Sequence, residues 1–150
     1  MEKDFTENTI ELIHHWSDTF DLPILKEEGF PEQARIDISL KLIDEELQET
    51  KDAIIARDFK ETKDGLGDLL WVTVRAMMEM GINPQEVIEK IYTSNMSKAD
   101  TSQEDALITY QQYMDKGIRT YSKEKNGLFI TYRMEDNKVL KSHKFKQPEL

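Results

Sequence analysis

Two acidic clusters at helical spacing constrain the fold of this 150-residue chain more than any other feature. The first cluster is Glu45-Glu46-x-x-Glu49, and the second is Asp64-Gly-Leu-Gly-Asp68, which leads directly into an apolar segment. Residues three or four apart share one face of an α-helix, so each cluster predicts an acidic face on its own helix. Several carboxylates gathered in one place repel each other and usually require a cation. Two such faces turned toward each other predict an all-oxygen cage suited to Mg²⁺ or Mn²⁺.

The same clusters also have an ordinary explanation, because most acidic helix faces are simply solvated. Asp64 and Asp68 share their sector of the second helix with other polar residues, namely Glu61, Arg75 and Glu79. A plain polar face would show the same pattern. Spacing alone therefore leaves both interpretations open.

The composition excludes several classes of function. With 20 Lys and Arg against 30 Asp and Glu, the formal net charge is −10, which argues against a nucleic acid or an anionic membrane as the main partner. The absence of cysteine excludes disulfides, thiolate catalysis and cysteine-zinc sites. The first residues lack the pattern of a signal peptide, and no apolar run reaches the roughly 18 residues of a membrane helix. We therefore expect a cytoplasmic protein.

The periodicity of apolar residues predicts a mainly α fold. Four helices are expected for a bundle, at about 6–20, 32–57, 60–80 and 84–94. Beyond residue 100, a capping box at Thr101-Ser-x-Glu-Asp105 predicts a short helix to about residue 115. Asn126-Gly127 then lies between two β-prone segments and predicts a small hairpin. We expect a helical core over residues 1–100, and a C-terminal extension over 101–150 packed on the same domain.

The order of the motifs resembles the all-α nucleoside triphosphate pyrophosphohydrolases. This superfamily includes MazG-like proteins, phosphoribosyl-ATP pyrophosphohydrolases and all-α dUTPases. Besides the two acidic clusters, the resemblance rests on the blocks Met80-Gly-Ile-Asn83 and Ser94-Asn-Met-Ser-Lys98. It covers residues 10–98 in order, and the tail Tyr132-Arg-x-x-x-Asn-Lys-Val-Leu-Lys141 resembles the C-terminal segment of single-domain MazG-like proteins.

This resemblance implies a MazG-like helical bundle that cleaves a nucleotide between its α- and β-phosphates. The products would be a nucleoside monophosphate and pyrophosphate. The metal ligands of the family fall on Glu45, Glu46, Glu49 and Asp68, and one of the three glutamates would act as the general base toward water. The implied metal is Mg²⁺, with Mn²⁺ as an alternative.

One position departs from the pattern of the family. The usual second motif is Glu-x-x-Asp, and glycine stands at its first position, Gly65. Asp64 precedes Asp68 by four residues and so reaches the same helix face. Either Asp64 substitutes as a ligand, which we favour, or the site has fewer ligands.

The resemblance also suggests residues that bind the substrate. Asn95 and Lys98 match a family element near the nucleotide, although the residues of an ordinary helix end would look the same. Arg75 is placed either to meet a phosphate or to pair with Glu79 on its own helix. From the tail, basic side chains would supply charge to the triphosphate or remain solvated, and these are Lys138 and Lys141.

Three functions follow from these observations. The leading expectation is a Mg²⁺-dependent pyrophosphohydrolase of nucleoside triphosphates, for house-cleaning or control of nucleotide pools. The tail favours this substrate class over phosphoribosyl-ATP. The alternatives are a nucleotide-binding regulatory module that has lost turnover, and a structural helical dimer with a solvated acidic face. We expect a homodimer or a larger homo-oligomer, because helices 32–57 and 60–80 each show more than one apolar face.

Overall fold

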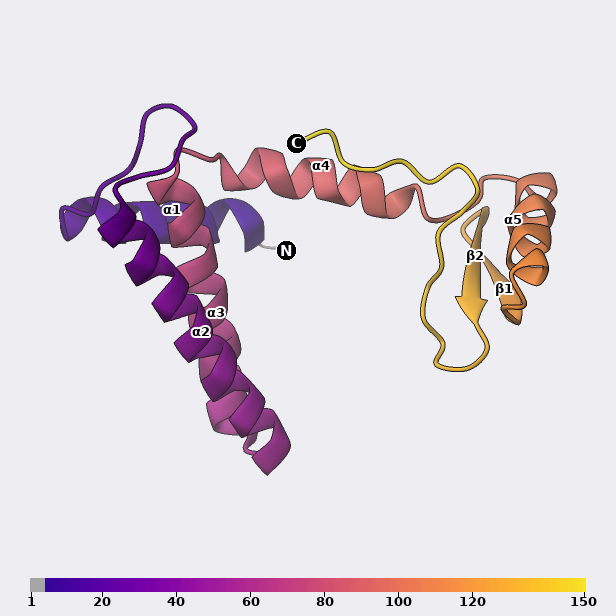
Figure 1. Cartoon of the computed structure of the whole chain (residues 1–150), viewed down its shortest axis with the longest axis horizontal. Coiled ribbons are helices and arrows are strands. Elements are labelled where there is room, and N and C mark those ends of the chain that lie inside the picture. Colours follow the sequence, from indigo (N-terminus) through magenta and orange to yellow (C-terminus); the bar gives the residue numbers. More distant parts are fainter. Residues whose placement is uncertain (1–4) are drawn as a thin grey trace. The chain divides into compact units, whose positions relative to one another are not determined.

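The computed structural model describes the backbone of residues 5–150 and the side chains of residues 9–150 (Figure 1). As the sequence predicts, this part of the chain is mainly helical and ends with a small antiparallel hairpin. The elements, in chain order, are α1 (Phe5–Thr19), α2 (Gln33–Ala56), α3 (Phe59–Glu79), α4 (Pro84–Met96), α5 (Gln103–Asp115), β1 (Thr120–Lys125) and β2 (Leu128–Arg133). Among the described residues, no helix combines the length and the apolar character that crossing a membrane requires.

The chain divides into two compact units, Met1–Val87 and Ile88–Leu150. The division falls inside α4, so most of that helix belongs to the C-terminal unit. Our expected domain boundary at residue 100 stays a prediction. Each unit is described below by itself.

A helical hairpin of α2 and α3 forms most of the N-terminal unit, and α1 packs against α3 (Figure 1). The connection is short because Arg57 adopts a left-handed conformation with a φ of 55° and ends α2. Asp58 then caps α3, its carboxylate accepting hydrogen bonds from the backbone N–H groups of Lys60 and Glu61. So short a connection leaves the two helices antiparallel and adjacent, with their acidic segments on neighbouring helices.

The core of this unit lies where α1 meets α3. Ile13, Val74 and Met78 are buried together, and partly buried side chains surround them, including Ile10, Ile24 and Trp71. Trp16 packs edge-on against Trp71, with ring centroids 5.6 Å apart. Ile10, Ile13 and Trp16 of α1 therefore face this core, whereas Phe20, just after the helix, is 61% exposed.

The apolar faces of α2 and α3 are covered only in part. Leu40 and Ile54 of α2 are 58% and 53% exposed. Leu66 and Leu70 on α3 are 52% and 43% exposed. One helical hairpin with α1 on one side provides too little surface to cover these faces. Within the N-terminal unit, apolar side chains therefore lie at the surface along both helices.

Local sequence signals place the elements of the C-terminal unit. Ser102 caps α5 and accepts a hydrogen bond from the backbone N–H of Asp105, as the capping box predicts. Asn126 and Gly127 have φ values of 54° and 76°, the two positive angles that a tight hairpin turn requires. The register pairs Thr120 with Arg133 and continues to the turn. α5 packs against both strands.

Candidate active site

The N-terminal unit holds both acidic clusters, on the adjacent helices α2 and α3. Glu46 is partly buried, whereas the other acidic side chains of the two clusters are exposed, namely Glu45, Glu49, Asp64 and Asp68. Lys41 lies 3.5 Å from the carboxylate of Glu45, one helical turn away, in a pair that is largely solvated. Such an exposed pair contributes little to neutralising the cluster.

Electrostatic repulsion couples the two clusters across the helical hairpin. Burial raises the pKa of Glu46 above its ordinary value of 4.5, and the next largest cause is the charge of Asp68. Further repulsion comes from the remaining carboxylates, Glu49, Glu45 and Asp64. Because Asp68 and Asp64 belong to α3, the acidic faces of α2 and α3 lie within electrostatic reach of each other. Carboxylates that raise the pKa of a neighbour in this way are stabilised by a positive charge placed among them.

The donor chemistry of this group fits a hard divalent cation, since every candidate ligand is a carboxylate oxygen and the carboxylates repel each other. Among the described residues, no three Asp, Glu or His side chains converge on one point closely enough to hold a metal ion. The carboxylates are therefore near one another without being gathered into a coordination shell. The assignment of Glu45, Glu46, Glu49, Asp64 and Asp68 as ligands stays a prediction.

The glycine that replaces the usual glutamate lies at a close contact between helices. A Cβ atom built on Gly65 would stand 2.7 Å from Thr50 Oγ1 and 3.1 Å from Thr50 Cα. Cβ atoms essentially never lie as close to another atom as 2.7 Å, and the tight contact at 3.1 Å is with the backbone of α2. A side chain at Gly65 would therefore force the two helices apart. Gly67, two residues later, has open space around its Cα.

Thr50 is the residue that our sequence analysis missed. It is 4% exposed, and its hydroxyl has no hydrogen-bond partner among the described residues. Thr50 directly follows Glu49 and lies one turn beyond Glu46, so its contact with Gly65 sets the helix spacing beside the acidic clusters. The available signal was Gly65 itself, because glycine inside a helix is unfavourable and often marks close packing.

Arg75 belongs to a buried ionic cluster further along α3. Its guanidinium lies 2.6 Å from Glu79, which is 2% exposed, and Arg35 of α2 binds the same carboxylate at 2.6 Å. The ring of Trp16 lies 5.5 Å from the guanidinium of Arg75. Of the two roles expected for Arg75, the structure contains the pair with Glu79. Its contact with a phosphate stays a prediction.

The other expected substrate-binding residues belong to the C-terminal unit. Asn95 accepts a hydrogen bond from the ammonium group of Lys98 at 2.7 Å, one turn apart at the end of α4. Lys141 lies over the ring of Phe145 at 4.2 Å, and Lys138 is exposed. The backbone carbonyl of Lys138 accepts a hydrogen bond from Arg133, so the segment lies along β2. Their roles in binding a triphosphate stay predictions.

Comparison with known proteins adds an independent finding. Residues 14–95 match the family model of phosphoribosyl-ATP pyrophosphohydrolase. The matched region spans more than half of the chain and contains both acidic clusters as well as Gly65 and Thr50. No curated protein shows a significant match to the chain. The helical architecture and the order of the motifs agree with this match, and the chain belongs to the phosphoribosyl-ATP pyrophosphohydrolase family, within the MazG-like all-α superfamily of nucleotide pyrophosphohydrolases.

Proposed function

We propose that this protein is a Mg²⁺-dependent pyrophosphohydrolase that cleaves a nucleoside triphosphate to the nucleoside monophosphate and pyrophosphate. The family consists of pyrophosphohydrolases that generally depend on a divalent metal. The observation that carries the proposal is the electrostatic coupling of Glu46 to Asp68 and Asp64 across two adjacent helices. Carboxylates that repel each other on rigid elements are suited to a divalent cation, and a solvated polar face has no need for such coupling.

Each acidic residue has a role in this proposal. Glu45, Glu46, Glu49 and Asp68 would hold the metal, with Asp64 in place of the missing side chain at Gly65. A bound divalent ion supplies positive charge to the phosphates and lowers the pKa of a coordinated water. One of the three glutamates of α2 would accept the proton of the attacking water. The contact between Gly65 and Thr50 would fix the distance between the two helices that carry these groups.

The basic residues of the C-terminal unit would complement the substrate. Asn95 offers an amide for a base or a sugar, and Lys98 offers an ammonium group for a phosphate. Lys138 and Lys141 would add further charge for the triphosphate. Arg75 already pairs with Glu79, so a phosphate role for Arg75 would require that it share its guanidinium.

A substrate panel tests the proposed function directly. The protein is incubated with the common ribo- and deoxyribonucleoside triphosphates and with phosphoribosyl-ATP, each with Mg²⁺ or Mn²⁺, and pyrophosphate is measured. We expect turnover of at least one nucleoside triphosphate. Turnover of phosphoribosyl-ATP alone would keep the chemistry and overturn the substrate class. Thermal stabilisation by nucleotides without any turnover would identify a regulatory module instead.

The site of bond cleavage is tested with isotopically labelled water. Attack at the α-phosphorus places ¹⁸O in the nucleoside monophosphate, which is the expected result. Label in pyrophosphate would mean attack at the β-phosphorus and would overturn the mechanism. The sequence contains no Gly-x-x-x-x-Gly-Lys loop of the kind that supports γ-phosphate transfer. Free phosphate or a nucleoside diphosphate is therefore not expected as an initial product.

The proposed enzyme is a homodimer or a larger homo-oligomer. Apolar side chains stay exposed along the α2–α3 hairpin, with Ile55 79% and Phe59 75% exposed at its tip. A patch of this kind favours association with a partner surface, and a second copy of the same hairpin offers a matching one. Light scattering at micromolar concentration tests this directly. A uniform monomer would contradict it.

A further inference from the structure

The small sheet of the C-terminal unit has one covered edge and one open edge. Beyond β2, backbone hydrogen bonds join Phe129 to Asp100, Thr131 to Leu140 and Arg133 to Lys138. These bonds leave the outer edge of β2 paired with other parts of the chain. β1, in contrast, has β2 as its one strand partner within residues 5–150. The edge of β1 that faces away from β2 is therefore free of any strand.

The register identifies the backbone groups on this open edge. Met134 N–H donates to Arg119 C=O at 3.0 Å, so the pair Arg119–Met134 is hydrogen-bonded. Hydrogen-bonded pairs alternate along an antiparallel ladder, which leaves Thr120, Ser122 and Glu124 in pairs without such bonds. The backbone N–H and C=O groups of these three residues therefore point away from β2. They form a row of donors and acceptors available to another strand.

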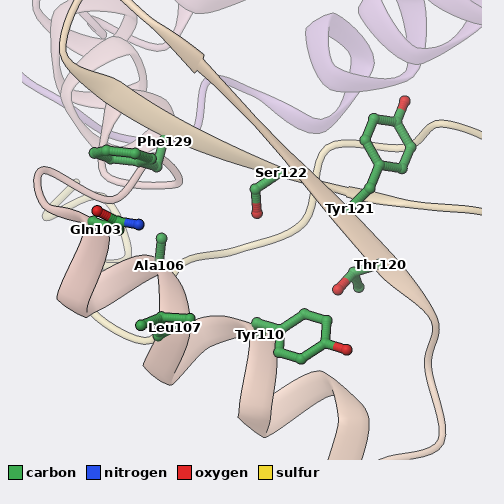
Figure 2. A pocket seen from close by; sticks show the side chains of 8 residues that line it. All are labelled: Gln103, Ala106, Leu107, Tyr110, Thr120, Tyr121, Ser122 and Phe129. Carbon is green, nitrogen blue, oxygen red and sulfur yellow. The ribbon is translucent and has the colours of Figure 1, made fainter.

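A groove runs along this edge, between β1 and α5 (Figure 2). Its volume is about 340 Å³. Three consecutive residues of β1 line it, namely Thr120, Tyr121 and Ser122. The side chains of Thr120 and Ser122 point toward α5, whereas the ring of Tyr121 points away from it. The opposite wall is one face of α5, formed by Gln103, Ala106, Leu107 and Tyr110, and Phe129 of β2 also contributes.

Two features of the groove point to an occupant. Thr120 is only 8% exposed, and its hydroxyl is buried. This hydroxyl has no hydrogen-bond partner among the described residues. Leu107 and Tyr110 are 63% and 39% exposed, so the wall formed by α5 is apolar and open. A strand that joined β1 would bury the apolar wall and satisfy the backbone groups of the edge together.

The charges of β1 select the chemistry of such a strand. Lys123 lies over the rings of Tyr121 and Tyr132, 5.7 Å from each centroid, so these residues share the face opposite α5. By alternation, Lys125 projects to the same face and, like Lys123, is exposed. Lysines beside an open edge disfavour neutral and basic strands and complement acidic side chains.

The same charges disfavour a second copy of β1. Across a two-fold axis, two β1 strands would have matching faces, so lysines of one copy would lie beside lysines of the other. We propose that the groove between α5 and β1 binds an extended peptide, which joins β1 as a third strand. The apolar side chains of this peptide face α5, and its acidic side chains, at alternate positions, face Lys123 and Lys125.

The 150-residue protein is tested with a synthetic nine-residue peptide in which valine alternates with glutamate. Titration is followed by amide NMR signals and by hydrogen exchange. We expect shifts at Thr120, Ser122 and Glu124, and slower exchange of these amides on binding. A peptide with lysine in place of glutamate should bind much more weakly. Failure of the valine–glutamate peptide to shift these signals at millimolar concentration overturns the proposal.

Two matched comparisons separate strand addition from other binding. In an extended peptide, the backbone N–H groups of odd-numbered and even-numbered residues point to opposite edges, so only one of these two sets can face β1. N-methylation of alternate residues removes one set and leaves the other. One methylated peptide should bind and the other should not, and equal binding of both contradicts strand addition. Ser122→Pro removes an outward N–H while sparing the β1–β2 ladder, so affinity should fall about tenfold, whereas Ser122→Ala should bind normally.

Hydrogen exchange of the free protein provides a last check. The amides of Ser122 and Glu124 should exchange rapidly, whereas those of Tyr121 and Lys123, inside the ladder, should be protected. Slow exchange of Ser122 and Glu124 without peptide would mean that another copy already covers the edge. That result overturns the proposal in favour of a self-associated sheet.

Discussion

In the C-terminal unit, buried carboxylates accept hydrogen bonds from side chains that are distant in sequence. Asp100, 2% exposed, binds the hydroxyls of Thr109 and Ser142, and Asp105 contacts His143 and Lys144 at 3.0 and 2.8 Å. The acidic clusters of α2 and α3 lack such partners and repel one another. The first arrangement stabilises the fold by itself, whereas in the second the carboxylates destabilise one another, and a bound cation would relieve that repulsion.

This difference separates structural charges from functional ones within one chain. The N-terminal unit has both kinds, since Glu79 is compensated by two arginines while Glu46 is surrounded by carboxylates. Carboxylates without a positively charged partner on rigid helices lower the stability of the fold. A function in binding a cation would explain why the chain contains them. The following experiments, from the largest expected effect to the smallest, test this distinction.

Asp68→Asn should reduce turnover at least about 100-fold, because a direct metal ligand matters at least as much as its outer-shell supports. In metal-free buffer, the variant should be as stable as the wild type or more so, since one repulsive charge near Glu46 is gone. The stabilisation by Mg²⁺, measured as a shift in Tm, should be lost. Asp44→Asn is the control, because Asp44 faces away from Glu46 and Glu49 on α2. Normal turnover of Asp68→Asn would refute the proposed chemistry.

Asp64→Asn tests separately whether Asp64 replaces the missing ligand. If it does, turnover and the Mg²⁺-dependent shift in Tm should both decrease, with the fold retained. Wild-type turnover and a wild-type shift would show instead that the site has one ligand fewer.

Glu79→Gln should cost about 3–5 kcal/mol of unfolding free energy, because Arg35 and Arg75 would keep buried charge without a compensating carboxylate. Urea unfolding measures the effect. Glu61→Gln is the matched control, since Glu61 lies on the same helix with its side chain 54% exposed, and it should change stability little. A small effect of Glu79→Gln would remove the contrast between compensated and uncompensated carboxylates in this unit.

Gly65→Ala should destabilise the protein by about 1–3 kcal/mol, because the new methyl group collides with Thr50. Gly67→Ala, two residues later in open space, should instead stabilise it by up to about 1 kcal/mol through helix propensity. Adding Thr50→Ala to Gly65→Ala should recover part of the loss, since the 3.1 Å contact with Cα remains. Equal effects of the two single substitutions would show that Gly65 does not set the helix spacing.

The two units should respond oppositely to acid. Hydrogen bonds from Lys144, and next from His143 and Ser102, lower the pKa of Asp105 from 3.8 to about 2. Its stabilising contribution is therefore complete above about pH 4 and is lost as the pH falls toward 2. The pKa of Glu46 is raised, so protonation as the pH falls toward 4.5 should favour the folded N-terminal unit. Hydrogen exchange resolved by residue, across pH 6 to 2, measures both trends.

Lys144→Met identifies the cause of the first trend. It should move the acid-induced loosening of the C-terminal unit to higher pH, because the largest cause of the lowered pKa of Asp105 is removed. Lys146→Met changes the same charge, and its side chain has no described contact with Asp105. Identical behaviour of these two variants would assign the effect to net charge alone.

Much of the fold follows from local sequence signals. The bounds of the five helices and the Asn126-Gly127 turn were predictable because capping residues, helix breakers and turn glycines act on neighbouring backbone atoms. The two acidic faces were predictable as well, because helical spacing alone places Glu45, Glu46 and Glu49 together. The order of the motifs along the chain then indicated the resemblance to a family.

The tertiary structure decided which of these residues have partners. No local signal pairs Arg75 with Arg35 through Glu79, or places Thr50 of α2 against Gly65 of α3. The open edge of β1 likewise depends on segments far apart in the chain that cover β2 instead. Helix bounds, turns and charge patterns depend on residues within a few positions of each other, so the sequence by itself determined them. Compensation of charge, helix spacing and edge exposure depend on contacts between distant segments, which only folding brings together.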